Sequence, residues 1–262
     1  MTIVAGCDVG SLTTKAVLLK DNRLISTSLI RSKAKPQESA RIAMEELFAK
    51  ADLSEKEMEY CVGTGYGREK LAFVNAVKSE IACHGKGAKW LLPSVKTIID
   101  IGGQDCKVIK IDESGTATRF VTNDKCASGT GRFLEVMAQV LGIDISELGQ
   151  QSSRSKSPVT LASTCTVWAQ ADVIKQINSG VPIEDIGAGI NLAMAKRIAT
   201  LANSIKPEND ICMTGGVAKN QGVMSLLEQL MGCRIRKIRK SDPQLAGAIG
   251  AALFAQEKLL SA

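Results

Sequence analysis

Two cysteines stand where the sequence could bind a metal. Cys126 lies in the stretch Asn-Asp-Lys-Cys-Ala-Ser-Gly-Thr-Gly-Arg-Phe and Cys165 in Ser-Thr-Cys-Thr-Val-Trp. Each precedes a segment with helical periodicity, and a helix N-terminus favours thiolate, the form that binds soft metals. Two further cysteines from a second copy of the chain would complete a four-cysteine site. The sequence therefore points to a metal centre shared by two subunits, and the alternative is a pair of small buried cysteines.

Two glycine turns suggest phosphate binding. One reads Asp8-Val-Gly-Ser-Leu-Thr-Thr-Lys15 and the other Asp100-Ile-Gly-Gly-Gln-Asp105, and each follows an apolar strand. Small residues let backbone amides approach a phosphate, Lys15 could add positive charge, and Asp8 could hold Mg²⁺ through water. Taken alone, the first turn would be a polar β-hairpin. The repeat predicts two similar halves facing each other across a cleft for phosphates and metal.

Three further features of the sequence bear on nucleotide binding or catalysis. A strand at residues 210–214 leads into Gly215-Gly216 and a helix, where a base or ribose could lie against the backbone. The Gly-x-Gly-x-Gly at residues 63–67 is interpreted as a tight connection. His84, the only histidine, has no obvious acid or second histidine nearby in the sequence and is predicted to be structural.

The elements that must position these groups alternate between strands and helices, which indicates an α/β fold. Strands are predicted at residues 2–7, 16–19, 23–30, 58–62, 96–99, 106–111, 116–121 and 210–214, and helices at 37–50, 77–92, 131–141, 167–177, 181–202 and after Pro243. The polar residues 150–157 are expected to form a surface loop. Residues 1–95 are predicted to form the first half and residues 96–262 the second, with the C-terminal helix able to cross over.

Composition limits the class of protein. A chain of 262 residues with 45% hydrophobic content can form one large domain or two ordinary ones. The chain has no membrane-length apolar run, and an acidic residue too near its start argues against a signal peptide, so a cytoplasmic protein is expected. Eight cysteines without regular spacing or a Cys-x-x-Cys pair indicate reduced thiols or metal ligands.

Net charge is +6, and the stretch from Arg234 to Lys240 is strongly basic. Nucleic acid is not expected as a partner, because only 3% of residues are aromatic and base stacking would have little to use. No membrane partner is expected either. The basic stretch is interpreted as a solvated strand edge or a docking patch for an acidic protein.

Taken together, these motifs resemble the ATPase superfamily of actin, sugar kinases and heat-shock chaperone ATPase domains. The two turns look like its phosphate loops, and Met213 to Asn220 looks like its adenosine motif. Within that superfamily, the Cys126 and Cys165 motifs resemble the activators of 2-hydroxyacyl-CoA dehydratases, of the BadF/BadG/BcrA/BcrD-type ATPase family. That family also includes ATPase components of benzoyl-CoA reductases and reductases of double-cubane cluster proteins.

The resemblance implies an α/β, actin-like (ribonuclease-H-like) fold with two duplicated βββαβα-type halves around a nucleotide cleft. It implies ATP or ADP with Mg²⁺, and one 4Fe-4S cluster per homodimer held by Cys126 and Cys165 of both chains. Carried over by position, catalytic and magnesium roles fall on Asp8, Asp100, Gln104 and Asp105. Nucleotide-binding roles fall on Gly10, Ser11, Leu12, Thr13, Thr14, Lys15, Gly102, Gly103, Gln104, Gly129, Gly215, Gly216, Lys219 and Gln244. The other cysteines (Cys7, Cys61, Cys83, Cys106, Cys212 and Cys233) are expected to be structural thiols.

The implied activity is an ATP-driven electron gate that is sensitive to oxygen. A ferredoxin or flavodoxin would reduce the cluster, and ATP hydrolysis would send the electron to an acceptor metalloenzyme carrying iron–sulfur clusters. Two alternatives share the fold: a small-molecule kinase, which would need a substrate domain and a general base, and a non-redox regulatory ATPase whose cysteines bind zinc or nothing.

The chain departs from the family pattern after Cys165. Many relatives continue Thr-Val-Phe-Ala-Glu-Ser-Glu, whereas this chain has Trp168, Gln170 and Asp172 in place of the Phe and the two Glu residues. Losing one carboxylate and shortening another could alter partner docking or redox potential without touching the ligands.

Overall fold

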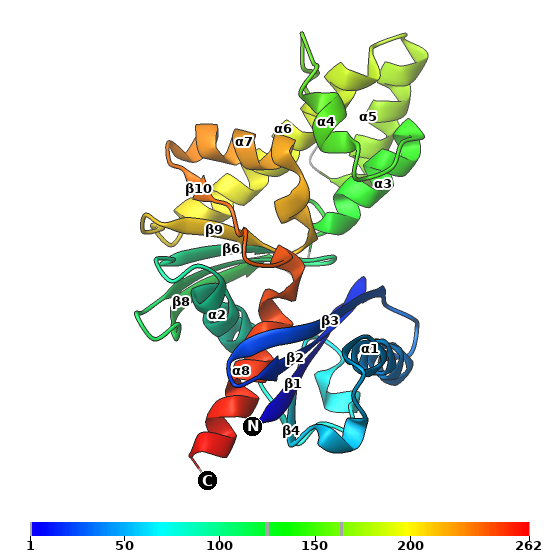
Figure 1. Cartoon of the computed structure of the whole chain (residues 1–262). Coiled ribbons are helices and arrows are strands. Elements are labelled where there is room, and N and C mark those ends of the chain that lie inside the picture. Colours follow the sequence, from blue (N-terminus) through cyan, green and yellow to red (C-terminus); the bar gives the residue numbers. More distant parts are fainter. Residues whose placement is uncertain (1, 124–125, 163–164, 262) are drawn as a thin grey trace. The chain divides into compact units, whose positions relative to one another are not determined.

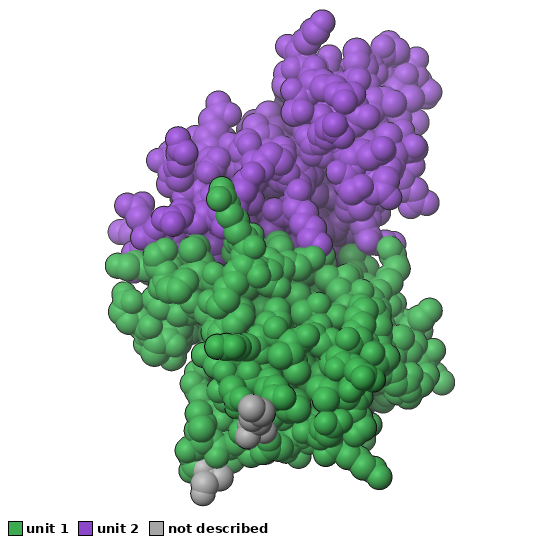
Figure 2. Space-filling view, viewed as in Figure 1, with its two compact units in different colours: residues 1–98, 109–119, 238–262 green, residues 99–108, 120–237 purple. Residues whose placement is uncertain are grey.

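The computed structural model describes residues 2–123, 126–162 and 165–261. By contacts, the chain divides into two compact units, coloured separately in Figure 2. Unit 1 comprises residues 1–98, 109–119 and 238–262, and unit 2 comprises residues 99–108 and 120–237. The C-terminal segment thus groups with the N-terminal unit. The boundary near residue 95 stays a prediction for the two ribonuclease-H-like halves.

Two five-stranded sheets have the same topology (Figure 1). The first sheet contains β1 (Ile3–Val9), β2 (Thr13–Lys20), β3 (Arg23–Arg31), β4 (Tyr60–Thr64) and β5 (Ala76–Val77), in the order β3-β2-β1-β4-β5. The second contains β6 (Thr97–Ile101), β7 (Cys106–Ile111), β8 (Ala117–Asn123), β9 (Ile211–Thr214) and β10 (Ile235–Arg236), in the order β10-β9-β6-β7-β8. If the first sheet is followed from β3 and the second from β8, both have the same order: the third, second, first, fourth and fifth strand of that sheet along the chain. The predicted duplicated α/β architecture is confirmed.

The first sheet is covered on both faces. Side chains of a strand alternate between faces, so Ala5 and Cys7 pack with α1 (Pro36–Ala51), whereas Val4 packs with α8 (Ala246–Leu260). Helix α2 (Glu80–Leu91) packs on α8. Asp8 has the same parity as Val4 and therefore lies on the α8 face.

Unit 2 contains the remaining helices: α3 (Gly131–Leu141), α4 (Leu148–Ser152), α5 (Thr166–Asn178), α6 (Ile183–Asn203) and α7 (Gln221–Met231). Its core joins Phe133, Met137, Ile186 and Ile190 to the inner residues of β6 and β9. Across the described ranges of the chain, no helix is long and apolar enough to cross a membrane.

Several strand ends differ from the predicted bounds by one to three residues, as in β2, β4 and β8, and two larger differences concern α2 and the loop at residues 150–157. The helix expected from residue 77 begins at Glu80, because residues 76–77 pair with β4 and the Ser79 hydroxyl caps the helix by accepting from the Ala82 N–H. The loop expected at residues 150–157 begins inside α4, whose buried Leu148 anchors a short helical turn. The basic stretch near Arg234 does contain an edge strand, β10, as expected.

Candidate functional site

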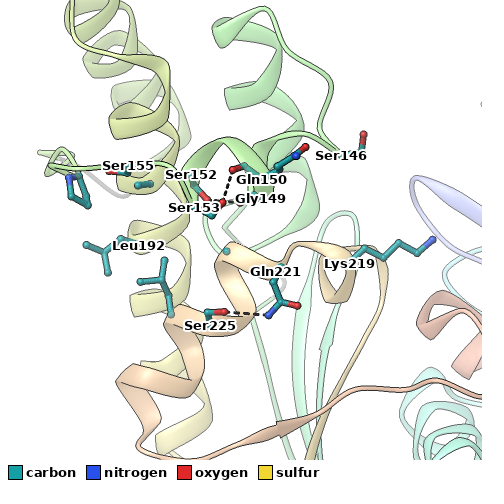
Figure 3. A pocket seen from close by; sticks show the side chains of 14 residues that line it. Ser146, Gly149, Gln150, Ser152, Ser153, Ser155, Leu192, Lys219, Gln221 and Ser225 are labelled. Atoms are coloured by element: carbon teal, nitrogen blue, oxygen red, sulfur yellow. Dashed lines mark hydrogen bonds between the residues drawn. The ribbon is translucent and has the colours of Figure 1, made fainter.

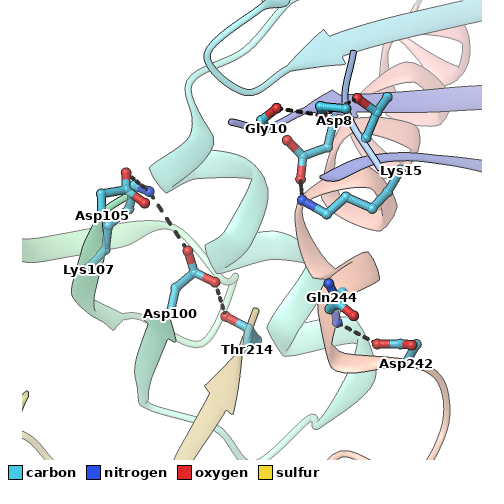
Figure 4. Close-up of polar contacts among 11 residues, drawn as sticks. Asp8, Gly10, Lys15, Asp100, Asp105, Lys107, Thr214, Asp242 and Gln244 are labelled. Carbon is cyan, nitrogen blue, oxygen red and sulfur yellow. Dashed lines mark hydrogen bonds and ion pairs between the residues drawn. The ribbon is translucent and has the colours of Figure 1, made fainter. Parts of the chain in front are cut away.

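The first turn, from Asp8 to Lys15, joins β1 to β2 and brings its two charged ends together. Asp8 is directly opposite Lys15 in the antiparallel register, and Lys15 Nζ donates to Asp8 Oδ2 over 3.1 Å (Figure 4). The Gly10 N–H donates to the Thr13 carbonyl over 3.1 Å and closes the turn. Only 3% of the Asp8 side chain and 13% of the Lys15 side chain are exposed. The turn thus presents a carboxylate and an ammonium, the groups that suit a magnesium-bound phosphate.

The second turn, from Asp100 to Lys107, repeats this arrangement with more charge. The Gly102 N–H donates to the Asp105 carbonyl over 3.0 Å. Lys107 pairs with Asp105 and lies 3.8 Å from Asp100 Oδ2, while Asp100 Oδ1 accepts a 2.7 Å hydrogen bond from the Thr214 hydroxyl (Figure 4). The three charged residues are at most 5% exposed. Two carboxylates therefore neutralise the buried Lys107 cation in the second turn.

Solvent reaches the tips of both turns. The partly exposed residues are Gly10, Ser11, Leu12, Thr13, Gly102 and Gly103, and Gln104 is exposed. Thr14 is buried, and its hydroxyl lies 2.9 Å from the Ser32 hydroxyl. Thr14 therefore supports the turn from below, and the tips are left open to a ligand.

The predicted adenosine motif follows β9. Gly215 has a φ of +80°, and a Cβ there would lie 2.2 Å from the Ile101 carbonyl oxygen, so only glycine fits. The next turn, η3 (Gly216–Lys219), places Lys219 in the lining of a cavity of about 590 Å³ (Figure 3). Further lining residues are Ser146, Gln150, Ser153, Leu192, Gln221 and Ser225. A cavity of this size, with apolar walls and a few amides and hydroxyls, suits a flat polar ring such as adenine.

Two other predicted nucleotide residues, Gly129 and Gln244, are not among the residues that line this cavity. Gly129 follows Cys126 in the same loop, has a φ of +86° and borders a separate cavity of about 330 Å³ together with Arg197. Gln244 lies in η4 (Pro243–Leu245), at the start of α8, where its N–H donates to Asp242 Oδ1. Their roles in nucleotide binding stay predictions.

The eight cysteines fall into two groups. Cys126 is half-buried and Cys165 is exposed at the N-cap of α5. The Ser128 hydroxyl beside its sulfur, helped by the Ser128 N–H and Arg197, holds the pKa of the Cys126 thiol below its usual value. Of the other six, Cys7, Cys61, Cys83, Cys106 and Cys212 are buried and Cys233 is half-buried. Burial raises the pKa of each of these six, to about 12 for Cys61, Cys83 and Cys212.

The loop carrying Cys126 is held by Asn123, the last residue of β8. The Asn123 side-chain amide donates to the Cys126 carbonyl over 3.2 Å and to the Ser128 carbonyl over 3.0 Å. Residues 124–125 and 163–164 of the two cysteine motifs lie outside the described residues. On the described ones, no group of three or more His, Cys, Asp and Glu side chains is arranged to hold a metal ion.

Main-chain hydrogen bonds connect the second turn to the Cys126 loop. The N–H groups of Gly131 and Arg132, at the start of α3, donate to the carbonyls of Gly102 and Gly103 over 2.8 and 2.9 Å. These N–H groups have no partner within their own helix, as at any helix N-terminus, so the turn satisfies them. A shift of the turn would consequently be felt at the helix that follows Cys126.

All three residues that depart from the family pattern lie on α5. Asp172 Oδ2 accepts a 2.6 Å hydrogen bond from the Ala162 N–H, just before the Cys165 motif. Trp168 is 68% exposed, beside the 71% exposed Val167. The shortened carboxylate therefore supports the approach to Cys165, while the new tryptophan changes the surface next to it.

Sequence analysis missed three residues that the structure places in these sites: Lys107, Thr214 and Asn123. Lys107 had a signal, because it follows Asp100 by the same seven residues that separate Lys15 from Asp8. Thr214 and Asn123 lie inside the predicted adenosine and Cys126 motifs, but the motifs did not indicate their contacts: Thr214 binds a carboxylate from another strand, and Asn123 binds two main-chain carbonyls of the loop that follows it.

The fold and the two turns define the class of protein first. Structures at low sequence identity share this fold, among them the ethanolamine utilization protein EutJ from Carboxydothermus hydrogenoformans (TM-score 0.61, 15% identity, covering 97% of this chain and 90% of that one). A ROK family glucokinase from Streptomyces griseus is similar (TM-score 0.59, 13% identity, covering 97% of this chain and 99% of that one). The chain thus has the actin-like ATPase fold. The sequence profile of the BadF/BadG/BcrA/BcrD ATPase family matches residues 5–255, and the chain belongs to this family of ATPases.

Relatives and solved structures of higher sequence identity support the same family assignment. The chain is 43% identical over 257 residues to the (R)-2-hydroxyglutaryl-CoA dehydratase activating ATPase of Acidaminococcus fermentans, covering 97% of this chain and 96% of that protein. It is 41% identical over 251 residues to the 2-hydroxyisocaproyl-CoA dehydratase activator of Clostridioides difficile, covering 95% and 93%. The crystal structure of the A. fermentans dehydratase component A superposes with a TM-score of 0.95, at 40% identity and covering 99% and 100%. A C. difficile activator structure with bound ADPNP gives the same TM-score at 39% identity, covering 99% and 96%.

Proposed function

We propose that this ATPase is an electron-transfer activator that passes a low-potential electron to a partner metalloenzyme. Its relatives include named dehydratase activators and one component of the benzoyl-CoA reductase of Thauera aromatica, 34% identical over 273 residues and covering 99% of this chain and 96% of that protein. The proposed acceptor is a 2-hydroxyacyl-CoA dehydratase, a benzoyl-CoA reductase-like enzyme or a double-cubane cluster protein. The proposed donor is a ferredoxin or flavodoxin.

The cysteines fit a 4Fe-4S cluster shared by a homodimer. A cluster needs four accessible thiolates, and Cys165 is exposed and Cys126 half-buried, whereas burial raises the pKa of Cys233, the other half-buried thiol. The lowered pKa of Cys126 favours the ligating form, and Cys165 is exposed at the N-cap position of α5. A second copy of the chain would supply the other pair. When bound, the cluster supplies one-electron transfer at low potential.

For the nucleotide, we propose that Asp8, Asp100 and Asp105 organise Mg²⁺ and its waters and that Gln104 orients the attacking water. The N–H groups at the tips of both turns and Lys15 bind phosphate oxygens, which positions the bond to be cleaved. The cavity beside Lys219 takes the adenine.

The observation that carries the coupled function is the pair of hydrogen bonds from Gly131 and Arg132 to Gly102 and Gly103. Hydrolysis changes the charge held by the second turn. The turn is bonded directly to the start of α3, so its displacement moves the loop that Asn123 and α3 hold at its two ends. Nucleotide state is thereby transmitted to Cys126 through contacts inside unit 2.

The test is iron and acid-labile sulfide per chain in anaerobically purified protein, with an electron paramagnetic resonance spectrum after dithionite reduction. We expect about two irons and two sulfides per chain, and a reduced signal lost in air. Cys126→Ser and Cys165→Ser should each lose the iron and keep nucleotide binding, whereas the matched variant Cys233→Ser should keep both. Zinc, or metal-free protein with full ATPase activity, would overturn the proposal.

A further inference from the structure

The only histidine of the chain lies beside Asp8. A Cβ built on Gly247, in the first turn of α8, would lie 2.9 Å from His84 Nε2 and also 2.9 Å from Asp8 Oδ2. The two atoms therefore flank one point and are at most twice that distance apart, within reach of a direct hydrogen bond or of one bridging water. His84 is 6% exposed and Asp8 is 2% exposed. Folding thus places His84, which follows Glu80 by four residues on α2, beside a second acid that is distant in the sequence.

Close packing of two helices fixes this arrangement. A Cβ on Gly250 of α8 would lie 1.8 Å from the Cys83 carbonyl oxygen, and one on Gly87 of α2 would lie 1.9 Å from the Ala246 carbonyl oxygen. The two backbones are therefore in contact on both sides of His84, which leaves the imidazole little freedom to move. An immobile side chain loses little conformational entropy when it holds a partner.

The carboxylate of Asp8 needs such a partner. It has about four lone-pair positions, and Lys15 Nζ occupies one of those on Oδ2. A cation and its waters require the remaining oxygen to point into the open turn, and rotation of the carboxylate would misplace it. An imidazole N–H on the Oδ2 side would prevent that rotation.

We propose that His84 is a positioning residue of the ATPase site, which holds the Asp8 carboxylate through Nε2, directly or through one water, in the orientation that binds the magnesium of the nucleotide. The proposal rests on the role proposed above for Asp8, and it is independent of the cluster and of the acceptor. Histidine acts here through Asp8 and does not touch the nucleotide.

The first test compares steady-state ATP hydrolysis by the wild-type protein and two variants. His84→Leu should lower kcat about tenfold to a hundredfold, because a misplaced magnesium ligand misaligns the reacting phosphate, while KM changes less than about threefold. His84→Gln retains a side-chain N–H and should recover most of kcat. Wild-type kcat in His84→Leu, or equal losses in the Leu and Gln variants, would overturn the proposal.

The Gly247→Ala variant separates the site from the fold. Its Cβ would push apart only the two side-chain ends of His84 and Asp8, and alanine is favoured over glycine in a helix by about 1 kcal/mol. We expect kcat to fall as in His84→Leu with no loss of thermal stability. The matched helical control is Gly187→Ala, whose Cβ would meet Leu148 Cδ1 at 3.4 Å and Ser152 Cβ at 3.9 Å, both ordinary contacts, and which should keep wild-type activity. Wild-type kcat in Gly247→Ala would contradict the proposal.

Because the chain has one histidine, nuclear magnetic resonance can observe its imidazole without assignment. Its signals should shift when Mg-ADP is added and also when Asp8 is changed to Asn. Signals insensitive to both changes would overturn the proposal even in a preparation that hydrolyses no ATP. Protein that lacks iron but shows both shifts would retain this role for His84 while removing the electron-transfer function.

Discussion

The two turns are built on one plan and carry different charges. Each has an aspartate in its incoming strand, a glycine two residues later and a lysine seven residues later. Each is closed by the same hydrogen bond, from the Gly10 N–H to the Thr13 carbonyl or from the Gly102 N–H to the Asp105 carbonyl. The duplicated strand order places both at corresponding positions in their sheets.

The differences lie around this shared frame. Lys15 has one carboxylate partner, whereas Lys107 has two, and Thr214 adds a donor to Asp100. Ser32 holds the first turn, through its N–H to the Leu12 carbonyl and its hydroxyl to the Gly10 carbonyl. The second turn is held by the start of α3. The two turns share one scaffold but differ in their supports: Ser32 holds the first turn, whereas the second is hydrogen-bonded to the helix that follows the Cys126 loop.

The largest effect is expected from a substitution that removes the positive charge of the second turn. Lys107→Met would leave Asp100 and Asp105 buried without their cation, and we expect a loss of about 3–5 kcal/mol in the free energy of unfolding. Lys15→Met leaves one carboxylate in a more accessible turn and should cost less, about 1–2 kcal/mol. Urea unfolding measures both.

The control for this pair is Lys50→Met, which removes an exposed i,i+4 partner of Glu46 and should change stability by less than about 0.5 kcal/mol. Equal losses for Lys107→Met and Lys15→Met would mean that the two turns do not differ in charge balance.

A smaller effect tests how similarly the two turns are buried. Cys7 precedes Asp8 and Cys106 precedes Lys107, and burial raises the pKa of both thiols. When the pH rises above the ordinary pKa of a thiol, these cysteines ionise in the unfolded chain but stay neutral in the folded protein. Each cysteine therefore contributes its full stability below about pH 8.5 and loses about 1.4 kcal/mol of it per pH unit above that value.

Cys7→Ala and Cys106→Ala should accordingly differ from wild type less at pH 10 than at pH 8, by similar amounts, when unfolding is measured in urea at both values. A difference that does not change with pH for one variant would show that its thiol is already ionised, or solvated, in the folded state.

The smallest expected effect tests the hydrogen bonds between the second turn and the start of α3. Gly131→Ala places a Cβ 3.0 Å from the Gly102 carbonyl oxygen and should weaken the bonds to the second turn by about 0.5–1.5 kcal/mol. In metal-free protein, we expect an ATP analogue to change the alkylation rate of Cys126, and Gly131→Ala to reduce that response.

Ser32→Ala is the counterpart in the first turn. Loss of its hydroxyl bond to the Gly10 carbonyl should weaken nucleotide binding by about twofold to tenfold and leave the Cys126 response intact at saturation. A reduced response in Ser32→Ala, with a normal one in Gly131→Ala, would reverse the assignment of the two turns.

Sequence reasoning succeeded where a signal is local. The strand at residues 106–111 and the helix at 131–141 have the predicted bounds, because apolar periodicity, the glycine before the helix and Gly142 after it all lie within the segment. The start of α2 was wrong, since pairing of residues 76–77 with β4 is a long-range contact. The repeated spacing of aspartate and glycine marks both turns in the sequence. The same repeat includes Lys107, which follows Asp100 by seven residues as Lys15 follows Asp8.

The sequence by itself determined the family, the two turns and the two cysteine motifs, because each is a contiguous run whose chemistry depends on near neighbours. Only the tertiary structure decided which thiols are accessible, which carboxylates share Lys107, and that His84 lies beside Asp8. Burial and charge pairing depend on residues distant in the chain, and here contact of glycine-rich helices places His84 Nε2 and Asp8 Oδ2 each 2.9 Å from a Cβ built on Gly247. The role proposed for His84 therefore depends on the packing of α2 on α8, the helix that covers β1.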